Sequence, residues 1–595
     1  MATASIFICH AHADAAFAQD LALALETYRL NIWRDTHGLR GGERLAPGIR
    51  WAIEQARQVI VVLGLNTGDP AWLRREIEIA QETERRRASS YRVIPLLLPG
   101  VDLAILNHWF TPPPRTAPVR LSTEGLGVVM PGLLTALGEP LPSETATDRS
   151  RPPPVELELT FSQSSPPTPD AWRLAARLNH HPLRTPTIVS TNVGSLPQPP
   201  DPRILRWYLQ DHLCWPIDTV RQLARHVDTC LASWGHTLYQ ATLGAPDLRD
   251  LVTAWRDDPD ARDHRLVVRT DAAPATAAAV LGLPWELLRD EAGFLLQGKQ
   301  PIQFQRQLSG GGDPFSPAPP PLRVLAISPR PDIEPTGHPD YRRHTLPLLE
   351  ALGNLGGLME LQLLNPPTLA TLEKRLNDAW STGRPFTALH LNGHLRHDSD
   401  QNAAVFGFEA SHDLYAPLCR DIQFVPASAL ASLLATYRIR LVVLACSRSD
   451  TGSTAVSELV SSLLAAGIAA TITVYPSTPM ETLRRFWAAF YEELLRGSRI
   501  SQAMFAGHRQ LASDSYRTVG LGGGGVYLQD WPTCALYLGQ HDPRLTVRPP
   551  LDLWRRLLDQ PQPDPPESLP KPSAIGCIGR GRDLLILERL FETHT

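Results

Sequence analysis

Residues 441–447 read LVVLACS, a short apolar run that ends in a cysteine. Similar apolar runs occupy residues 323–328, 386–391 and 468–474, and segments with helical spacing separate them. Runs of this length that alternate with amphipathic helices predict a mainly parallel sheet covered on both faces. Ligands of such sheets bind beyond the carboxyl ends of the strands, which is where Cys446 lies.

A histidine follows the apolar run at 386–391. The segment continues through Asn392 and Gly393 to His394, which precedes Cys446 by about 50 residues, the order found in caspase-type proteases. A thiolate can attack a peptide carbonyl while an imidazole assists proton transfer to the leaving amine. The sequence therefore predicts that His394 and Cys446 act together at one edge of the sheet.

The chain around these two residues resembles a protein family. Residues 155–545 resemble the CHAT domain, a caspase-like α/β module, in Trp234-Gly235, LPWELL at 283–288, residues 390–394, the strand ending in Cys446, and residues 486–497. The resemblance implies that Cys446 is the nucleophile, His394 the catalytic histidine, and Gly393 a backbone donor to the oxyanion. It also implies protein substrates, no cofactor, an N-terminal subdomain at 155–321 and a catalytic subdomain at 322–545.

Two other interpretations of these side chains stay open. A free cysteine is most often a small buried apolar residue, which would give Cys446 only a packing role. Alternatively, His390, His394 and His397 could supply zinc ligands, although no pair of thiols completes such a site. The segment 475–479 carries no charge, so the residue preferred at the cleavage position is undetermined.

The N-terminal part of the chain repeats the alternation of strands and helices. Apolar runs at 5–9, 30–33, 59–63 and 91–98 are separated by helical patterns at 17–28, 49–58 and 72–87. This order predicts a second parallel sheet with helices on both faces.

Residues 4–135 resemble the TIR domain, which has a flavodoxin-like parallel sheet. The resemblance rests on residues 7–14, 31–35, 39–43 and 47–49, and on WLRRE at 72–76. It implies that NAD is a substrate and that Glu76 is the catalytic carboxylate. It further implies substrate-binding roles for four residues, Trp33, Trp72, Arg40 and Gly41, and it implies homotypic contacts with oligomerisation on activation.

The chemistry of NAD cleavage suits a carboxylate at position 76. Loss of nicotinamide passes through an oxocarbenium-like state that a carboxylate beside the ribose stabilises. Trp72 and Glu76 are four residues apart and therefore share one face of a helix.

Two alternatives remain: Glu76 is a solvated partner of Arg74, Arg75 or Arg85, or the domain is an inactive assembly module. The second gains weight because Cys9, Ala11 and Gly64 stand where family members often have serine.

Composition limits the classes of function. The 595 residues are 43% hydrophobic and 20% charged with a net charge of −4, which suits buried cores and gives no electrostatic argument for binding nucleic acid or an anionic membrane. The seven cysteines are scattered and include no CxxC pair, which argues against a disulfide scaffold and against a zinc knuckle. We therefore expect no bound metal. The longest apolar stretch, 463–475, is too short to cross a bilayer, so we expect a cytoplasmic protein.

Clusters of proline divide the chain. We expect a TIR domain at 1–140, a linker at 141–154, a CHAT domain at 155–545, a second linker at 546–571 and a terminal segment at 572–595. The terminal segment, CIGRGRDLL at 577–585 with Leu587 and Leu590, resembles the opening of a STAND or AAA-like NTPase domain. Together the resemblances imply a bacterial immune or stress-response protein, active for example in antiphage defence; the alternative is a TIR signalling scaffold with only the protease active, or with neither site active.

Overall fold

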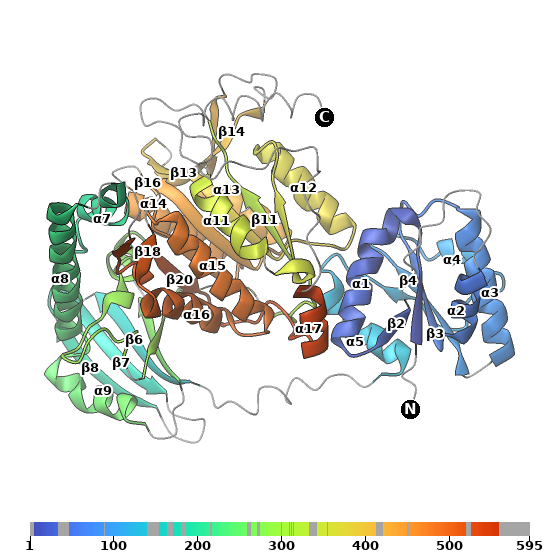
Figure 1. Cartoon of the computed structure of the whole chain (residues 1–595), viewed down its shortest axis with the longest axis horizontal. Coiled ribbons are helices and arrows are strands. Elements are labelled where there is room, and N and C mark those ends of the chain that lie inside the picture. Colours follow the sequence, from blue (N-terminus) through green and yellow to red (C-terminus); the bar gives the residue numbers. More distant parts are fainter. Residues whose placement is uncertain are drawn as a thin grey trace.

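A computed structural model describes the following residues: 5–33, 47–87, 90–139, 154–163, 171–179, 186–214, 217–258, 263–270, 274–298, 300–308, 310, 312, 314–331, 342–353, 355–400, 402–411, 420–448, 452–518 and 525–558. Figure 1 shows two units side by side, a small one built from the described residues up to 139 and a larger one built from the described residues 154–558. None of the helices within these residues has the length and apolar character needed to cross a membrane.

The small unit is a parallel sheet between two layers of helices. Its five strands run in the order β2-β1-β3-β4-β5, and every pair of neighbours is parallel. This is the flavodoxin-like strand order, so the expected fold class is confirmed. The central strand is buried along its whole length because it has helices on both sides. The strands are β1 (Ser5–Cys9), β2 (Asn31–Trp33), β3 (Gln58–Leu63), β4 (Arg92–Leu97) and β5 (Val119–Arg120).

Five helices cover this sheet. They are α1 (Ala15–Thr27), α2 (Pro47–Gln55), α3 (Ala71–Arg87), α4 (Ile105–Trp109) and α5 (Leu126–Leu137). In Figure 1, α1 and α5 face the larger unit, whereas α3 and α4 lie on the side away from it.

The larger unit is organised around one mixed sheet of 13 strands. The main path runs β12-β11-β13-β16-β17-β20-β10-β9-β6-β7-β8, and β14 and β15 extend from β13 as an antiparallel flap. The first five strands of the path are parallel, as the apolar runs predict: β12 (Met359–Leu363), β11 (Leu322–Ile327), β13 (Ala388–Asp398), β16 (Leu441–Arg448) and β17 (Ala470–Val474). The flap consists of β14 (Ala403–Glu409) and β15 (Ile422–Pro426).

The region before Leu322 is more regular than its sequence suggests. It contributes five strands to the same sheet, so the segments expected as two subdomains share one sheet. These strands are β6 (Val155–Gln163), β7 (Trp172–Asn179), β8 (Thr187–Val193), β9 (His264–Thr270) and β10 (Ile302–Gln307). β20 (Cys534–Leu538) joins them to the parallel part because it pairs with both β10 and β17.

Helices pack on both faces of this sheet. They are α7 (Pro202–Leu209), α8 (Asp218–Ala241), α9 (Arg249–Arg256), α10 (Pro274–Leu281), α11 (Arg342–Gly353), α12 (Leu369–Ser381), α13 (Ala427–Thr436), α14 (Gly452–Ala465), α15 (Met480–Leu495), α16 (Ile500–Ser513) and α17 (Leu551–Leu558). α11 and α16 pack against α15, and α13 packs against α14. A separate hairpin, β18 (Tyr516–Thr518) with β19 (Gly525–Tyr527), follows α16.

Two of the segments that carry the CHAT resemblance contact each other. A Cβ at Gly235 on α8 would lie 1.9 Å from the carbonyl oxygen of Leu287, so only glycine permits this approach. Glu286 beside that contact forms a fully buried ion pair with Arg306, at 2.6 Å between Oε1 and Nη1. The two motifs therefore fix α8 and β10 to one another.

Candidate active sites

The strands β13 and β16 bring His394 and Cys446 to the same edge of the large sheet. The two strands are parallel neighbours, with Gly393 opposite Cys446 and His394 opposite Ser447. Residues 388–393 of β13 and residues 441–446 of β16 are buried, and His394 is the first residue of β13 that is partly exposed. The structure thus brings together the two residues that the sequence singles out.

The thiol of Cys446 lies over the backbone of Gly393. Its side chain is 4% exposed, and the Gly393 N–H donates a hydrogen bond to the sulfur. A Cβ at Gly393 would lie 2.8 Å from Cζ of Phe406, whose ring on β14 covers the same face of the strand. Glycine is therefore required here, because a side chain would collide with the Phe406 ring.

Burial favours the neutral form of both groups. Burial raises the pKa of the Cys446 thiol to about 12, although the hydrogen bond from the Gly393 N–H lowers this pKa in part. Burial also lowers the pKa of His394. The site as it stands holds a thiol and a neutral imidazole, not a thiolate–imidazolium pair.

The face of the strand that carries His390 and Asn392 differs from the face of Cys446. His390 Nε2 lies 2.5 Å from the hydroxyl of Tyr491 on α15, and Asn392 donates to Ser328 at 2.9 Å. Side chains alternate along a strand, so His394 shares this face, whereas the Cys446 side chain extends from the other face.

The zinc interpretation finds no support in the described part of the chain. His397 Nδ1 lies 3.3 Å from Glu458, and His390 is engaged with Tyr491. Among the residues that the structure describes, no group of three histidine, cysteine or acidic side chains is arranged to hold a metal ion.

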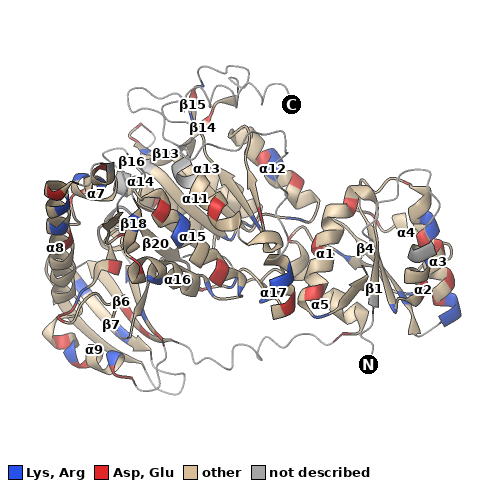
Figure 2. Ribbon diagram, viewed as in Figure 1, with Lys and Arg blue, Asp and Glu red and all other residues tan. Residues whose placement is uncertain are grey.

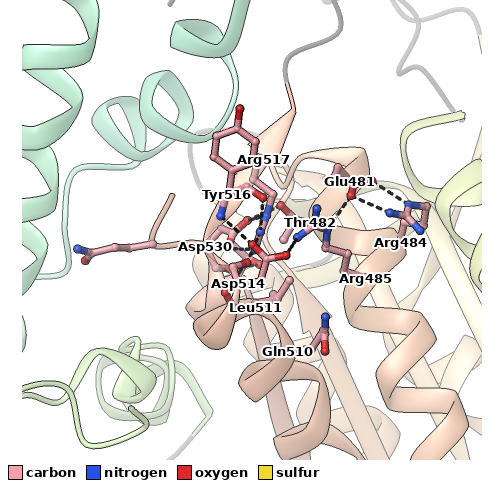
Figure 3. Close-up of polar contacts among 12 residues, drawn as sticks. Glu481, Thr482, Arg484, Arg485, Gln510, Leu511, Asp514, Tyr516, Arg517 and Asp530 are labelled. Atoms are coloured by element: carbon pink, nitrogen blue, oxygen red, sulfur yellow. Dashed lines mark hydrogen bonds and ion pairs between the residues drawn. The ribbon is translucent and has the colours of Figure 1, made fainter. Parts of the chain in front are cut away.

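A buried polar cluster lies beside the loop that follows β17. Arg517 donates to both carboxylate oxygens of Asp530 at 2.8 Å, and Thr482 at the start of α15 donates to the same carboxylate (Figure 3). Arg517 is 1% exposed and Asp530 is fully buried. The cluster fastens the hairpin β18–β19 to the first turn of α15, directly after the uncharged segment 475–479.

In the small unit, Glu76 points inward. It lies on α3 and is 4% exposed, whereas Arg74 pairs with Asp69 and Arg75 with Glu78. The thiol of Cys9, at the end of β1, donates to the Glu76 carboxylate; burial and the neighbouring negative charge raise the pKa of that thiol. Cys9 therefore supplies a donor at a position where the resemblance leads one to expect a serine hydroxyl.

The tryptophans lie around the same edge of the small sheet. Trp72, one turn before Glu76, is partly buried and packs on the core of this unit. Trp33 ends β2, pairs with Phe7 of β1 in the ladder and is 39% exposed. Its ring meets that of Trp51 at 5.9 Å, edge to face. Arg40 and Gly41 lie outside the described residues.

Sequence reasoning missed Asp14, which is 5% exposed and lies at the same edge. It accepts a hydrogen bond from Thr67 at 2.6 Å, and Thr67 accepts one from the Gly64 N–H at 2.6 Å. A Cβ at Gly64 would lie 2.5 Å from Asp14 Oδ1, so the carboxylate fills the space that a serine would need. In the sequence, the one hint of this arrangement is the glycine at position 64, where family members often have serine.

Two family models match the chain. Residues 6–113 match the TIR domain, and residues 233–545 match the CHAT domain, which covers more than half of the chain. The two matches include Glu76 in one case and both His394 and Cys446 in the other.

Individual relatives cover smaller parts. A curated protein from a Theionarchaea archaeon, NAD(+) hydrolase TcpA, is 33% identical over 85 residues, which is 14% of this chain and 26% of that protein. The chain thus spans about a quarter of the length of that relative. Among solved structures, the TIR domains of the activated Roq1 resistosome match 18% of this chain and 63% of that chain with 20% identity and a TM-score of 0.16. The Saccharomyces cerevisiae separase–securin complex matches 60% of this chain and 21% of that chain with 10% identity and a TM-score of 0.23.

Proposed function

Because the chain belongs to the CHAT domain family, we propose that it is a caspase-like cysteine endopeptidase in which Cys446 is the nucleophile and His394 the general acid and base. The observation that supports this most is the pairing of Gly393 with Cys446 on adjacent parallel strands. It gives the sulfur a backbone N–H neighbour and leaves a histidine one residue away on the next strand. The Gly393 N–H would then stabilise the oxyanion once the carbonyl binds.

Mutation of the cysteine tests this proposal. We would measure cleavage of a peptide library by the full chain, fused after Thr595 to a tetramerising coiled coil so that the molecules are clustered. Cys446→Ala should abolish cleavage, and His394→Ala should lower it by about 10²- to 10⁴-fold. Cys534→Ala is the matched control, because Cys534 is also a buried cysteine of this sheet but lies on β20. Full cleavage by Cys446→Ala would refute the assignment.

For the TIR domain we propose NAD hydrolysis with Glu76 as the catalytic carboxylate. Two observations support this proposal. The buried Glu76 carboxylate, with Cys9 as its donor, lies at the same sheet edge as the partly exposed Trp33. The domain is also similar to the NAD(+) hydrolase TcpA. NAD is then a substrate, and Trp72, Arg40 and Gly41 would help to bind it. The second candidate is an assembly module without catalysis, which the absence of serine at positions 9 and 64 favours.

Nicotinamide release separates the two candidates. Glu76→Gln should lower turnover by at least about two orders of magnitude if the carboxylate contacts the ribose. Glu84→Gln is the matched control, because Glu84 is a buried carboxylate on the same helix that accepts from the Val93 N–H at 3.0 Å. Equal release by wild type and Glu76→Gln would refute the catalytic role of Glu76, and no release by the clustered wild type would leave only the assembly role.

The wider context follows from combining the two domains. The protein would act in bacterial immunity or a stress response, in the cytoplasm, with activation by homotypic TIR contacts and cleavage of protein substrates. The segment 572–595, which would open a STAND-type NTPase domain, lies outside the described residues.

A further inference from the structure

Among the described residues, the ion pairs between the two units all have one polarity. Each pair joins an acid of the TIR unit to an arginine of the CHAT unit: Asp20 with Arg384, Glu124 with Arg438 and Glu26 with Arg556. Asp20 Oδ2 lies 2.5 Å from Arg384 Nε, and their side chains are only 13% and 19% exposed. The two surfaces are therefore complementary in charge, and the central pair is largely desolvated.

Close backbone packing accompanies the ion pairs. A Cβ at Gly383 would lie 2.3 Å from Cδ2 of Leu121, and one at Gly127 would lie 3.2 Å from Cα of Ala318. Leu23 of α1 is buried in the hydrophobic core of the CHAT unit. The contact between the units thus includes apolar burial as well as surface charges.

The arginines of this interface lie next to the strands that carry the protease residues. Arg384 lies four residues before β13, and Arg438 lies three residues before β16. His394 and Cys446 lie farther along these two strands, about 17–20 Å from the first residue of each strand at 3.3 Å per residue. The TIR domain therefore holds the amino ends of the two strands whose carboxyl ends form the protease site.

The remaining arginine comes from α17, the last helix that the structure describes. Leu553 and Leu557 are buried, and the Leu557 carbonyl oxygen would lie 2.3 Å from a Cβ at Gly356 in the CHAT unit. Arg556, which is adjacent to this buried face, forms an ion pair with Glu26 on α1. Figure 1 shows α17 between α1 and the CHAT unit, and Figure 2 shows the charged positions of α17 at this junction.

We propose that the docked TIR domain is an internal regulator of the CHAT site, and that its release converts the buried Cys446 into an accessible thiol. While the amino ends of β13 and β16 are fixed, the sulfur stays buried. When the TIR domain leaves, the two strands can shift relative to each other and to the flap β14–β15. The inference rests on the proposed protease function, but its test does not depend on peptide cleavage.

The experiment compares two variants of the full chain. In the reversed variant, Asp20→Arg, Glu26→Arg and Glu124→Arg place like charges across the interface. In the restored variant, these changes are combined with Arg384→Glu, Arg438→Glu and Arg556→Glu. Small-angle scattering measures whether the units separate, and peptide mass spectrometry measures the rate at which iodoacetamide labels Cys446, with buried Cys534 as internal reference.

We expect the reversed variant to have a larger radius of gyration and Cys446 labelling that is faster by about ten-fold, within the usual range of coupling between sites. Labelling of Cys534 should stay unchanged, and the restored variant should return both quantities toward wild type. Separation of the units without faster labelling of Cys446 would overturn the proposal, and so would an unchanged radius of gyration in the reversed variant. Faster labelling without cleavage of any peptide would support the coupling and refute the protease function.

Discussion

The protonation of Cys446 gives the most direct prediction for a single side chain. Alkylation requires the thiolate, and the pKa of this thiol is raised to about 12, so the logarithm of its labelling rate should rise by about one per pH unit through pH 10. A cysteine in an unstructured peptide should level off above its ordinary pKa of about 8.5 under the same conditions. A plateau for Cys446 at or below pH 9 would show that the pKa of this thiol is not raised, and a plateau below about pH 7 would indicate a thiolate paired with His394.

The same shift affects stability with a defined sign. The fold favours the protonated thiol, so its contribution is fully present below the unfolded pKa of about 8.5 and declines as the pH rises above that value. Cys446→Ala should reduce the loss of stability between pH 8.5 and pH 10, as measured by urea unfolding. An unchanged pH dependence in this variant would show that the folded pKa is not raised.

Gly64 and Gly132 offer a pair of substitutions with opposite expected effects. Gly64→Ala would put a methyl group 2.5 Å from Asp14 Oδ1 and should lower the free energy of unfolding by about 1–3 kcal/mol. Gly132 lies within α5, and a Cβ there has no neighbour within 4 Å. Gly132→Ala should therefore raise the free energy of unfolding by about 0.5–1 kcal/mol. Thermal unfolding of both variants measures the difference, and a neutral Gly64→Ala would show that Asp14 does not occupy this space.

The hairpin β18–β19 depends on one buried ion pair. Asp530→Ala would leave the Arg517 guanidinium buried without its carboxylate and should cost about 3–5 kcal/mol in urea unfolding. The double variant Arg517→Met/Asp530→Leu removes both charges and should cost clearly less than Asp530→Ala alone. Equal costs for the single and double variants would mean that the packing of these side chains, and not their charge, secures the hairpin.

Strands with continuous apolar runs could be predicted from the sequence, whereas alternating strands were missed. Residues 59–63 and 441–445 are apolar throughout because both faces are covered, and the structure has strands there. β6 instead reads VELELTFSQ and buries every second residue, since only one of its faces is fully covered. No strand was predicted here from the sequence, and the partner strand β9 lies about 100 residues later in the chain.

The candidate sites were predictable only in part. His394 and Cys446 could be found because each ends an apolar run, and Glu76 because it stands in a recognisable segment. Asp14 could not, since its importance comes from Thr67 and Gly64, about 50 residues away. The contact between Asp20 and Arg384 spans 364 positions and has no local pattern at all.

Assembly should control the activity of the whole molecule. If TIR contacts complete the NAD site, fusing a tetramerising coiled coil after Thr595 should raise NAD turnover per chain, because tethering raises the effective concentration of weak interfaces. Arg40→Glu should cancel this gain. Arg203→Glu is the control, since the Arg203 side chain is 92% exposed on α7 of the other unit. Equal turnover by the unfused chain at nanomolar concentration would rule out assembly-dependent activation.

The central claim is that Cys446 is the nucleophile of a protease site at the edge of the large sheet. The most direct measurement treats the clustered chain with a peptidyl acyloxymethyl ketone and locates the adduct by peptide mass spectrometry. The account predicts one adduct, on Cys446, and its loss in His394→Ala, where the proton acceptor is missing. An adduct on Cys9, Cys230 or Cys534 with Cys446 unmodified would contradict it.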